Sequence, residues 1–138
     1  KKIKIEPDEL QKLFTEDRKE HVENTILPAL KKGKTVISDR YAFSTFAYGG
    51  LTSKKEWLME INNEFPLPDL TLFIDVTPYE CLKRIGSRGK NIELFEEEKK
   101  LENIRKNYLE LSKLFQGFKI VDGSGTIEET HKKSMHYV

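Results

Sequence analysis

Residues 35–41 combine a short apolar run with a charged pair. The stretch "TVISDRY" predicts a buried strand that ends at Asp39 and Arg40. In open α/β sheets, ligands bind beyond the carboxyl ends of the strands. At such an end Arg40 offers a planar fork of donors for phosphate oxygens, and Asp39 could hold a Mg²⁺-bound water or orient a hydroxyl group. The structural alternative is that Asp39 caps the next helix while Arg40 forms a surface ion pair.

Aromatic side chains and a second arginine accompany this pair. Phe14 and Arg18 are four residues apart and therefore share a helix face. A ring and a guanidinium at that spacing can stack on a flat base and hydrogen-bond to it. Tyr48 precedes two glycines at the end of a predicted helix, where its ring can face a cleft, and Ser44 could contact a ligand hydroxyl or phosphate. Alternatively, Phe14 is a core residue, Arg18 pairs with an acidic residue on its own helix, and Ser44 is a cap.

Two loops add basic and glycine-rich character. The stretch "LKRIGSRGKNIE" contains Arg84 and Arg88 together with two lysines. A mobile basic loop can close over a polyphosphate and exclude water, although a solvated surface loop has the same composition. The turn "VDGSG", which contains Gly123 and Ser124, could place backbone amides near a base or phosphate, or it is an ordinary turn.

Hydrophobic spacing predicts the elements that position these residues. Apolar residues recur at three- and four-residue steps in residues 6–34, which indicates a helix that Pro28 can kink. We expect Thr52 or Ser53 to cap one later helix, and Thr77 to cap another that begins at Pro78. Helices that alternate with short buried strands indicate an α/β fold with a doubly wound parallel sheet. Short apolar runs predict the strands at 35–38, 70–76 and 118–123, and further helices are expected at 52–65, 77–85, 95–115 and 126–138.

The length, net charge and cysteine content of the chain exclude several classes of function. The chain has 138 residues, the size of one domain, and its many charges nearly cancel to +1. This balance provides no general attraction to nucleic acid or to a membrane. A single cysteine, Cys81, excludes an internal disulfide and a cysteine-based zinc site, and we expect a cytoplasmic location. No apolar stretch reaches the roughly 18 residues of a membrane span.

Taken together, four motifs resemble thymidylate kinase in their order and approximate spacing. The motifs are "LFTEDRKEHVENTILPALKKGKTVISDRYAFSTFAYGG", "PDLTLFIDV", "LKRIGSRG" and "IVDGSG". The resemblance implies a P-loop kinase fold with a short lid at about residues 86–94, in which residues 1–138 form a single domain. It also implies transfer of the γ-phosphoryl group of ATP to dTMP, with Mg²⁺, in a homodimer that binds neither nucleic acid nor membrane.

On the side that binds dTMP, the resemblance implies a role for each matching residue. Phe14 corresponds to the phenylalanine that stacks on thymine, and Arg18 to the arginine that contacts thymine. Asp39, Arg40 and Tyr41 match the family's DRY or DRH motif, in which Arg40 holds the dTMP phosphate. Asp39 would serve the metal through a water and act at the phosphoryl centre. The nucleotide pocket would further be lined by Tyr41, Ser44 and Tyr48.

On the side that binds ATP, the matching residues belong to the lid and to the last turn. Arg84 resembles a lid-side arginine near adenine, and Arg88 resembles the lid arginine that contributes to catalysis. Glu93 matches the acidic end of the lid. Gly123 and Ser124 fall where the family approaches adenine.

Three features depart from the family pattern. The P-loop, G-x-x-x-x-G-K-S/T, is absent from the printed residues, so we expect roughly fifty further residues upstream and no catalysis without them. Gly49 stands where many bacterial members have glutamine, and Asn91 replaces a lid arginine, which leaves Arg88 or Lys90 as the lid cation. Two alternatives stay open. The protein could be a kinase for dUMP or dCMP, because one methyl group contributes only ~1–3 kcal/mol to discrimination between substrates. It could also be a truncated, non-catalytic nucleotide-binding module.

Overall fold

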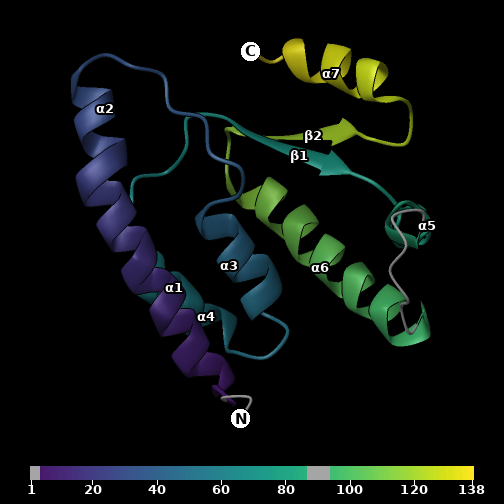
Figure 1. Ribbon diagram of the computed structural model, residues 1–138, viewed down its shortest axis with the longest axis horizontal. Helices are drawn as coiled ribbons and strands as arrows, with labels where there is room; N and C mark the ends of the chain where they lie inside the picture. The colour runs from purple at the N-terminus through teal and green to yellow at the C-terminus, as the bar shows by residue number, and fades with distance from the viewer. Residues whose placement is uncertain (1–3, 87–93) are drawn as a thin grey trace. The chain divides into compact units, whose positions relative to one another are not determined.

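Two units with separate cores make up the chain in a computed structural model that describes residues 4–86 and 94–138. Unit 1 covers residues Lys1–Leu67 and is helical in its described part, whereas unit 2 covers residues Pro68–Val138 and contains a parallel sheet. Figure 1 labels their helices and strands.

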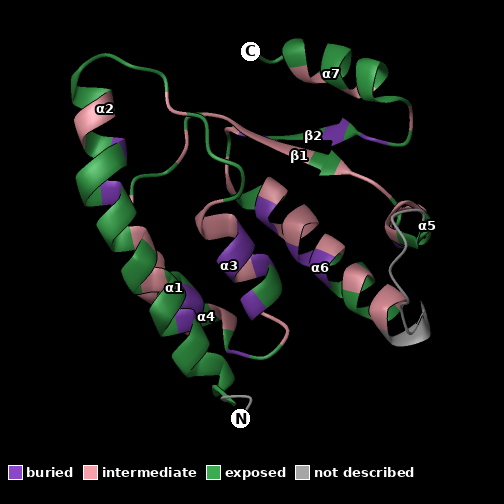
Figure 2. Ribbon diagram, viewed as in Figure 1, coloured by how far each residue is buried: buried purple, intermediate pink, exposed green. Residues whose placement is uncertain are grey.

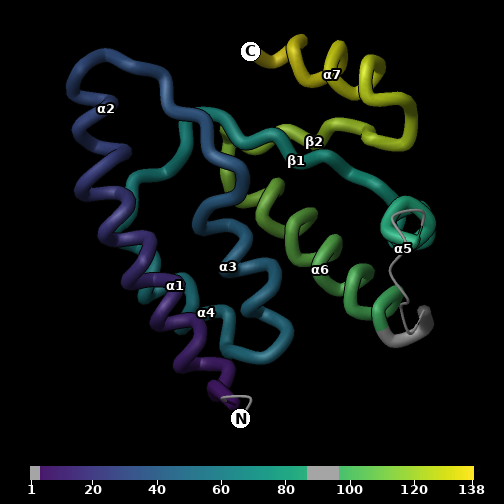
Figure 3. The backbone as a smooth tube through the Cα atoms, in the orientation of Figure 1, coloured from purple at the N-terminus to yellow at the C-terminus, as the bar shows by residue number. Residues whose placement is uncertain are grey.

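Unit 1 begins with one continuous helical run (Figure 3). It consists of α1 (Pro7–His21), the π-helical segment η1 (Val22–Ile26) and α2 (Leu27–Lys31). Pro28 lacks an N–H group and its ring crowds the carbonyl four residues earlier, which disfavours regular α-helical bonding there. The turn before it is wider, since the Leu27 N–H donates to the Val22 carbonyl. The irregularity expected at Pro28 therefore takes the form of a π-helical turn.

The run ends at Gly33, whose φ of 70° is in the left-handed region. The Gly33 N–H donates to the Leu30 carbonyl and the Lys34 N–H to the Ala29 carbonyl. This pair of bonds is the Schellman arrangement, which satisfies carbonyls that the helix end would otherwise leave unpaired. The helix predicted within residues 6–34 thus ends at a glycine.

The predicted strand at residues 35–38 is wrong. Residues 34–38 have no regular secondary structure, and the Ile37 side chain is 93% exposed. Among the residues that the structure describes, strand pairing joins only β1 (Thr71–Asp75) to β2 (Phe118–Asp122). A short β-branched run favours a strand, but pairing and burial stabilise it, and neither is present here.

The core of unit 1 lies where the first helical run meets α3 (Ala42–Gly49) and α4 (Lys55–Asn62). Its buried apolar residues come from η1, α3 and α4: Val22, Ile26, Ala47 and Leu58. Figure 2 shows α3 largely buried and α1 largely exposed. The predicted cap of α4 is wrong, because its N-cap is Lys54, without a side-chain hydrogen bond, and the Ser53 hydroxyl donates to Asp8 Oδ1 instead.

Unit 2 confirms the expected α/β class with a parallel pair of strands. β1 and β2 run parallel, with Thr71 opposite Phe118 and Asp75 opposite Asp122. Parallel strands need a long crossover connection, and here it contains α5 (Pro78–Gly86) and α6 (Leu94–Leu114). Both α6 and α7 (Ile127–Met135) contact β2, and Figure 1 shows them on opposite sides of the strands.

Helix α5 begins with the predicted cap, and α7 begins with a capping box that was not predicted. Pro78 is the first residue of α5, and the Thr77 hydroxyl accepts a hydrogen bond from the Glu80 N–H at 3.4 Å. Thr126 and Glu129 form a reciprocal capping box at the start of α7. The half-buried rings of Phe73 in β1 and Tyr108 in α6 stack, with their centroids 4.7 Å apart. In the described ranges 4–86 and 94–138, every helix is too short or too polar to cross a membrane.

Candidate functional site

A cleft of about 230 Å³ opens in unit 1 between α1, the segment before α3, and α3 itself. It contains all six residues that the sequence predicts for substrate binding: Phe14, Arg18, Arg40, Tyr41, Ser44 and Tyr48. Five further residues complete its lining: Gln11, Asp17, His21, Ser38 and Thr45. Side chains 37 positions apart in the sequence, from Gln11 to Tyr48, thus face one space.

Arg18 is held in the cleft by neutral partners from other elements. Its two Nη groups donate to Asn62 Oδ1 at 2.6 Å and to Thr45 Oγ1 at 2.7 Å. Its guanidinium carbon lies 5.7 Å from the centroid of the Tyr41 ring. The alternative that Arg18 pairs with an acidic residue of its own helix is therefore wrong, because its hydrogen bonds go to Asn62 and Thr45. Burial lowers the pKa of Arg18, while Tyr41 and Asp17 oppose that shift.

Arg40 reaches the cleft from a bent backbone. Its φ of 66° is in the left-handed region, which costs a non-glycine residue about 1–3 kcal/mol. The Ser38 hydroxyl donates to the Arg40 carbonyl at 2.7 Å, and Arg40 Nε donates to the Ser44 hydroxyl at 3.0 Å. The guanidinium lies 4.5 Å from the centroid of the Tyr48 ring. These contacts orient the side chain, and within the described chain no carboxylate forms the predicted surface ion pair with it.

Aromatic faces complete the cleft. Phe14 is 49% exposed, so its ring is open to a planar ligand rather than buried in the core. The Tyr41 hydroxyl is buried and has no hydrogen-bond partner in the described part of the protein. Burial raises the pKa of Tyr41, and the nearby charge of Arg18 opposes that rise. The phenol therefore stays protonated and able to donate a hydrogen bond at neutral pH.

Asp39 lies outside this group of residues. Its side chain is exposed, and it is not among the residues that line the cleft. It does not cap α3 either, because the N-cap is Tyr41, without a side-chain hydrogen bond. Within residues 4–86 and 94–138, no cluster of three or more histidine, cysteine or acidic side chains could hold a metal ion. A single carboxylate nevertheless suits Mg²⁺, which keeps several waters and takes further ligands from substrate phosphates.

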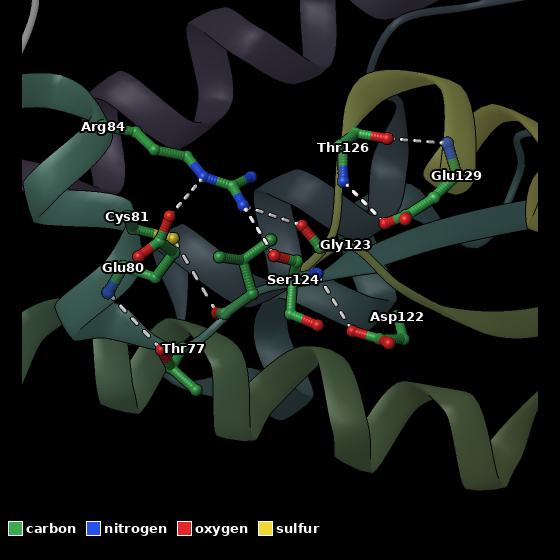
Figure 4. Close-up of polar contacts among 10 residues, drawn as sticks. Thr77, Glu80, Cys81, Arg84, Asp122, Gly123, Ser124, Thr126 and Glu129 are labelled. Atoms are coloured by element: carbon green, nitrogen blue, oxygen red, sulfur yellow. Dashed lines mark hydrogen bonds and ion pairs between the residues drawn. The ribbon is translucent and has the colours of Figure 1, made fainter.

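In unit 2, the structure brings together Arg84, Gly123 and Ser124. Arg84 Nε donates to Glu80 Oε1 at 3.0 Å, and its Nη2 donates to the carbonyls of Gly123 and Ser124 at 3.0 and 3.4 Å. Figure 4 shows the guanidinium pointing at these carbonyls. Arg84 is thereby fixed between the start of its own helix and the turn after β2.

The backbone amides of Gly123 and Ser124 donate to acceptors within unit 2. The Gly123 N–H donates to the Asp75 carbonyl at 2.9 Å, and the Ser124 N–H donates to Asp122 Oδ1 at 2.9 Å. The expectation that this turn approaches a base or phosphate stays a prediction, and in this arrangement these two amides have acceptors within unit 2. Arg88, with Lys90, Asn91 and Glu93, lies outside the described residues.

Three cleft contacts were missed by the sequence reasoning. Thr45 and Asn62 hold Arg18, and Gln11 lines the cleft although it is only 6% exposed. Gln11 is three residues before Phe14 and seven before Arg18, so helical spacing places all three on one face. That spacing was the available signal for Gln11. Nothing local in the sequence joins Asn62 to a side chain 44 positions away.

Comparisons with known proteins agree on one family. A family model described as thymidylate kinase matches residues 1–134. A probable thymidylate kinase from Pyrococcus abyssi is 44% identical over 124 residues, which are 87% of this chain and 59% of that protein. One from Pyrococcus horikoshii is 40% identical over 131 residues, covering 94% and 63%. One from Methanococcoides burtonii is 38% identical over 142 residues, covering 96% and 70%. The chain thus spans about 59–70% of the length of these relatives.

Proposed function

The chain belongs to the thymidylate kinase family, and from this premise we propose that the protein transfers the γ-phosphoryl group of ATP to dTMP, yielding dTDP and ADP. The family has a P-loop kinase fold, with which the parallel pairing of β1 and β2 agrees. The observation that supports the proposal is the cleft of unit 1, where two arginines and several aromatic rings share one space.

Arg40 is proposed to bind the phosphate of dTMP. Ser44 and Tyr48 hold its guanidinium through Nε and one ring face, and neither of these two contacts is a hydrogen bond from an Nη group. A planar pair of N–H donors matches two oxygens of a phosphate. Phosphoryl transfer depends chiefly on positioning and on neutralising charge, and a preorganised arginine supplies both to the acceptor phosphate.

Arg18 and Phe14 are proposed to bind the base. Arg18 carries five N–H donors and no acceptor, so it suits a carbonyl oxygen of thymine or uracil and does not suit the amino group of cytosine. The ring of Phe14, about half exposed, offers a stacking surface beside it. This donor chemistry favours dTMP or dUMP over dCMP. Tyr41 and Ser44 would contact the remaining nucleotide atoms.

The donor side of the reaction rests on fewer described residues. We propose that Arg84, Gly123 and Ser124 lie near the adenine of ATP, and that Arg88 acts at the transferring phosphoryl group. Asp39 would hold Mg²⁺ through a water, and that ion would supply charge neutralisation between the phosphates. A homodimer, a cytoplasmic location and a single kinase domain over residues 1–138 complete the proposal.

The test is a coupled assay of the full-length protein with ATP and Mg²⁺ against dTMP, dUMP, dCMP and dAMP. We expect dTMP to react fastest and dUMP to follow, slower by about 10- to 200-fold, the effect of one methyl group. Faster turnover of dCMP than of dTMP would contradict the assignment. Calorimetric binding of dTMP without turnover would instead support the alternative of a non-catalytic nucleotide-binding module.

A further inference from the structure

Gln11 has an unusual environment in the cleft of unit 1. Polar side chains that are buried almost always have hydrogen-bond partners. Among the residues that the structure describes, buried side-chain oxygens without a partner occur at two positions, Gln11 Oε1 and Tyr41 Oη. Both of these side chains line the same cleft. Two unsatisfied polar groups in one cleft are explained if a ligand supplies the missing partners.

Gly49 makes room for this carboxamide. A Cβ atom built at Gly49 would lie 2.9 Å from both Cδ and Oε1 of Gln11, closer than such atoms approach in proteins. It would also lie 3.2 Å from Leu58 Cδ1, which belongs to the core. The Gln11 carboxamide therefore occupies the space that a side chain at position 49 would take. Its place against α3 depends on the glycine.

We propose that Gln11 is a base-recognition residue, whose carboxamide hydrogen-bonds to the imide edge of the pyrimidine. The inference rests on the proposed function and names a further specificity-determining residue for it. An imide edge presents an N–H group between two carbonyls, as in thymine and uracil. A carboxamide offers the complementary acceptor and donor, and its terminal torsion is broad, so it can turn either atom toward the cleft.

The spacing along α1 supports this assignment. Gln11, Phe14 and Arg18 share one helix face, and all three line the cleft. Arg18 carries only donors and so requires a carbonyl, whereas only Gln11 of these three can accept a hydrogen bond from the N–H between the carbonyls. Stacking, carbonyl recognition and N–H recognition of one base are thereby divided among three residues of one helix.

The test compares Gln11→Leu with the wild-type protein by calorimetry, using dTMP and an analogue methylated at N3 of the base. Gln11→Leu keeps the size of the side chain and removes both polar atoms. We expect dTMP to bind about tenfold more weakly, the effect of one neutral hydrogen bond. The wild-type preference for dTMP over the N3-methyl analogue should shrink by about the same factor, and Gln116→Leu, at an exposed position of unit 2, should change neither value.

A thermal readout separates recognition from a structural role. Free Gln11→Leu should melt at the same temperature as the wild type or higher, because it removes a buried polar atom that has no partner. Unchanged affinity for dTMP in Gln11→Leu would overturn the inference. Failure of the wild-type protein to bind dTMP at all would overturn the proposed function itself.

A second variant tests the same contact if Gln11→Leu does not fold. Gly49→Ala should weaken dTMP binding in the wild-type background, because its methyl group displaces the Gln11 carboxamide. In a Gln11→Ala background, Gly49→Ala should change the affinity for dTMP little, since the space beside position 49 is then open. Equal losses of affinity in the two backgrounds would show that Gly49→Ala acts without Gln11 and would overturn the assignment.

Discussion

The cations of the two units have different partners. In unit 2, Arg105 forms a two-pronged ion pair with Asp75 at 2.6 and 2.9 Å, and Lys133 pairs with Asp122 at 2.8 Å. In the cleft of unit 1, Arg18 and Arg40 are held by the neutral side chains of Asn62, Thr45 and Ser44. A cation paired with a carboxylate is neutralised and stabilises the fold. A cation held by neutral groups keeps its charge for a ligand.

The pKa values of Arg18 and Arg105 are shifted in opposite directions. The hydrogen bonds to Asp75 raise the pKa of Arg105. Burial lowers the pKa of Arg18, because its charge is partly removed from water, and in the described residues its side-chain hydrogen bonds go to neutral groups rather than to a carboxylate. An anionic or carbonyl-bearing ligand would supply part of that missing stabilisation. Arg18 is thus arranged for binding and Arg105 for stability.

The largest expected effect is that of Arg40→Ala. We expect dTMP affinity to fall about 100-fold, because charge-assisted hydrogen bonds to the phosphate are lost. The affinity for thymidine, which has no phosphate, should fall by no more than about threefold. Calorimetry with both ligands measures the difference. Equal losses for dTMP and thymidine would show that Arg40 only supports the local fold.

Arg18→Lys should have a smaller effect with a different ligand pattern. Lysine keeps the charge but cannot form the planar fork that contacts Asn62 and Thr45. We expect affinity to fall about tenfold for dTMP and thymidine alike, since the contact is to the base. The two dissociation constants are compared by calorimetry. A loss confined to dTMP would place Arg18 at the phosphate instead.

Arg105→Ala tests the unit 2 side of the comparison. The pair with Asp75 is partly exposed, with 37% of the Arg105 side chain accessible, so its removal should lower the free energy of unfolding by only about 1 kcal/mol. Urea denaturation measures this value. The dTMP dissociation constant should be unchanged. A tenfold loss of dTMP affinity would mean that the two units do not divide binding and stability in this way.

The smallest effect is expected for Asp122→Asn. Hydrogen bonds from Lys133 and Ser124 hold the pKa of Asp122 well below its usual value. A carboxylate with a lowered folded-state pKa contributes stability above its unfolded value, near 3.9, and loses that contribution as the pH falls. The wild type should therefore melt slightly above the variant at pH 7 in low salt, and the difference should vanish in acid. A difference that is as large at pH 2 as at pH 7 would contradict this origin.

Local signals predicted the elements of unit 2 well. Thr77 and Pro78 mark the start of α5, and the apolar runs at 70–76 and 118–123 contain the two strands, because caps and core-facing runs depend on near neighbours. The same reasoning failed at 35–38, where the apolar run has no strand partner and Ile37 is exposed. Propensity suggests an extended chain, whereas a strand also requires a second strand beside it.

Residue types and short spacings singled out Phe14, Arg18, Arg40, Ser44 and Tyr48 as candidates. The resemblance to thymidylate kinase added Tyr41 and joined them in one nucleotide site, and all six line the cleft. These signals were readable because helical periodicity and the Asp-Arg-Tyr motif are local. Only the tertiary structure decided that Asn62 and Thr45 would hold Arg18, that Asp39 would stay outside the cleft, and that Gln11 would lie against Gly49. Such contacts join distant segments, and their partners follow from how the helices pack rather than from the residues on either side.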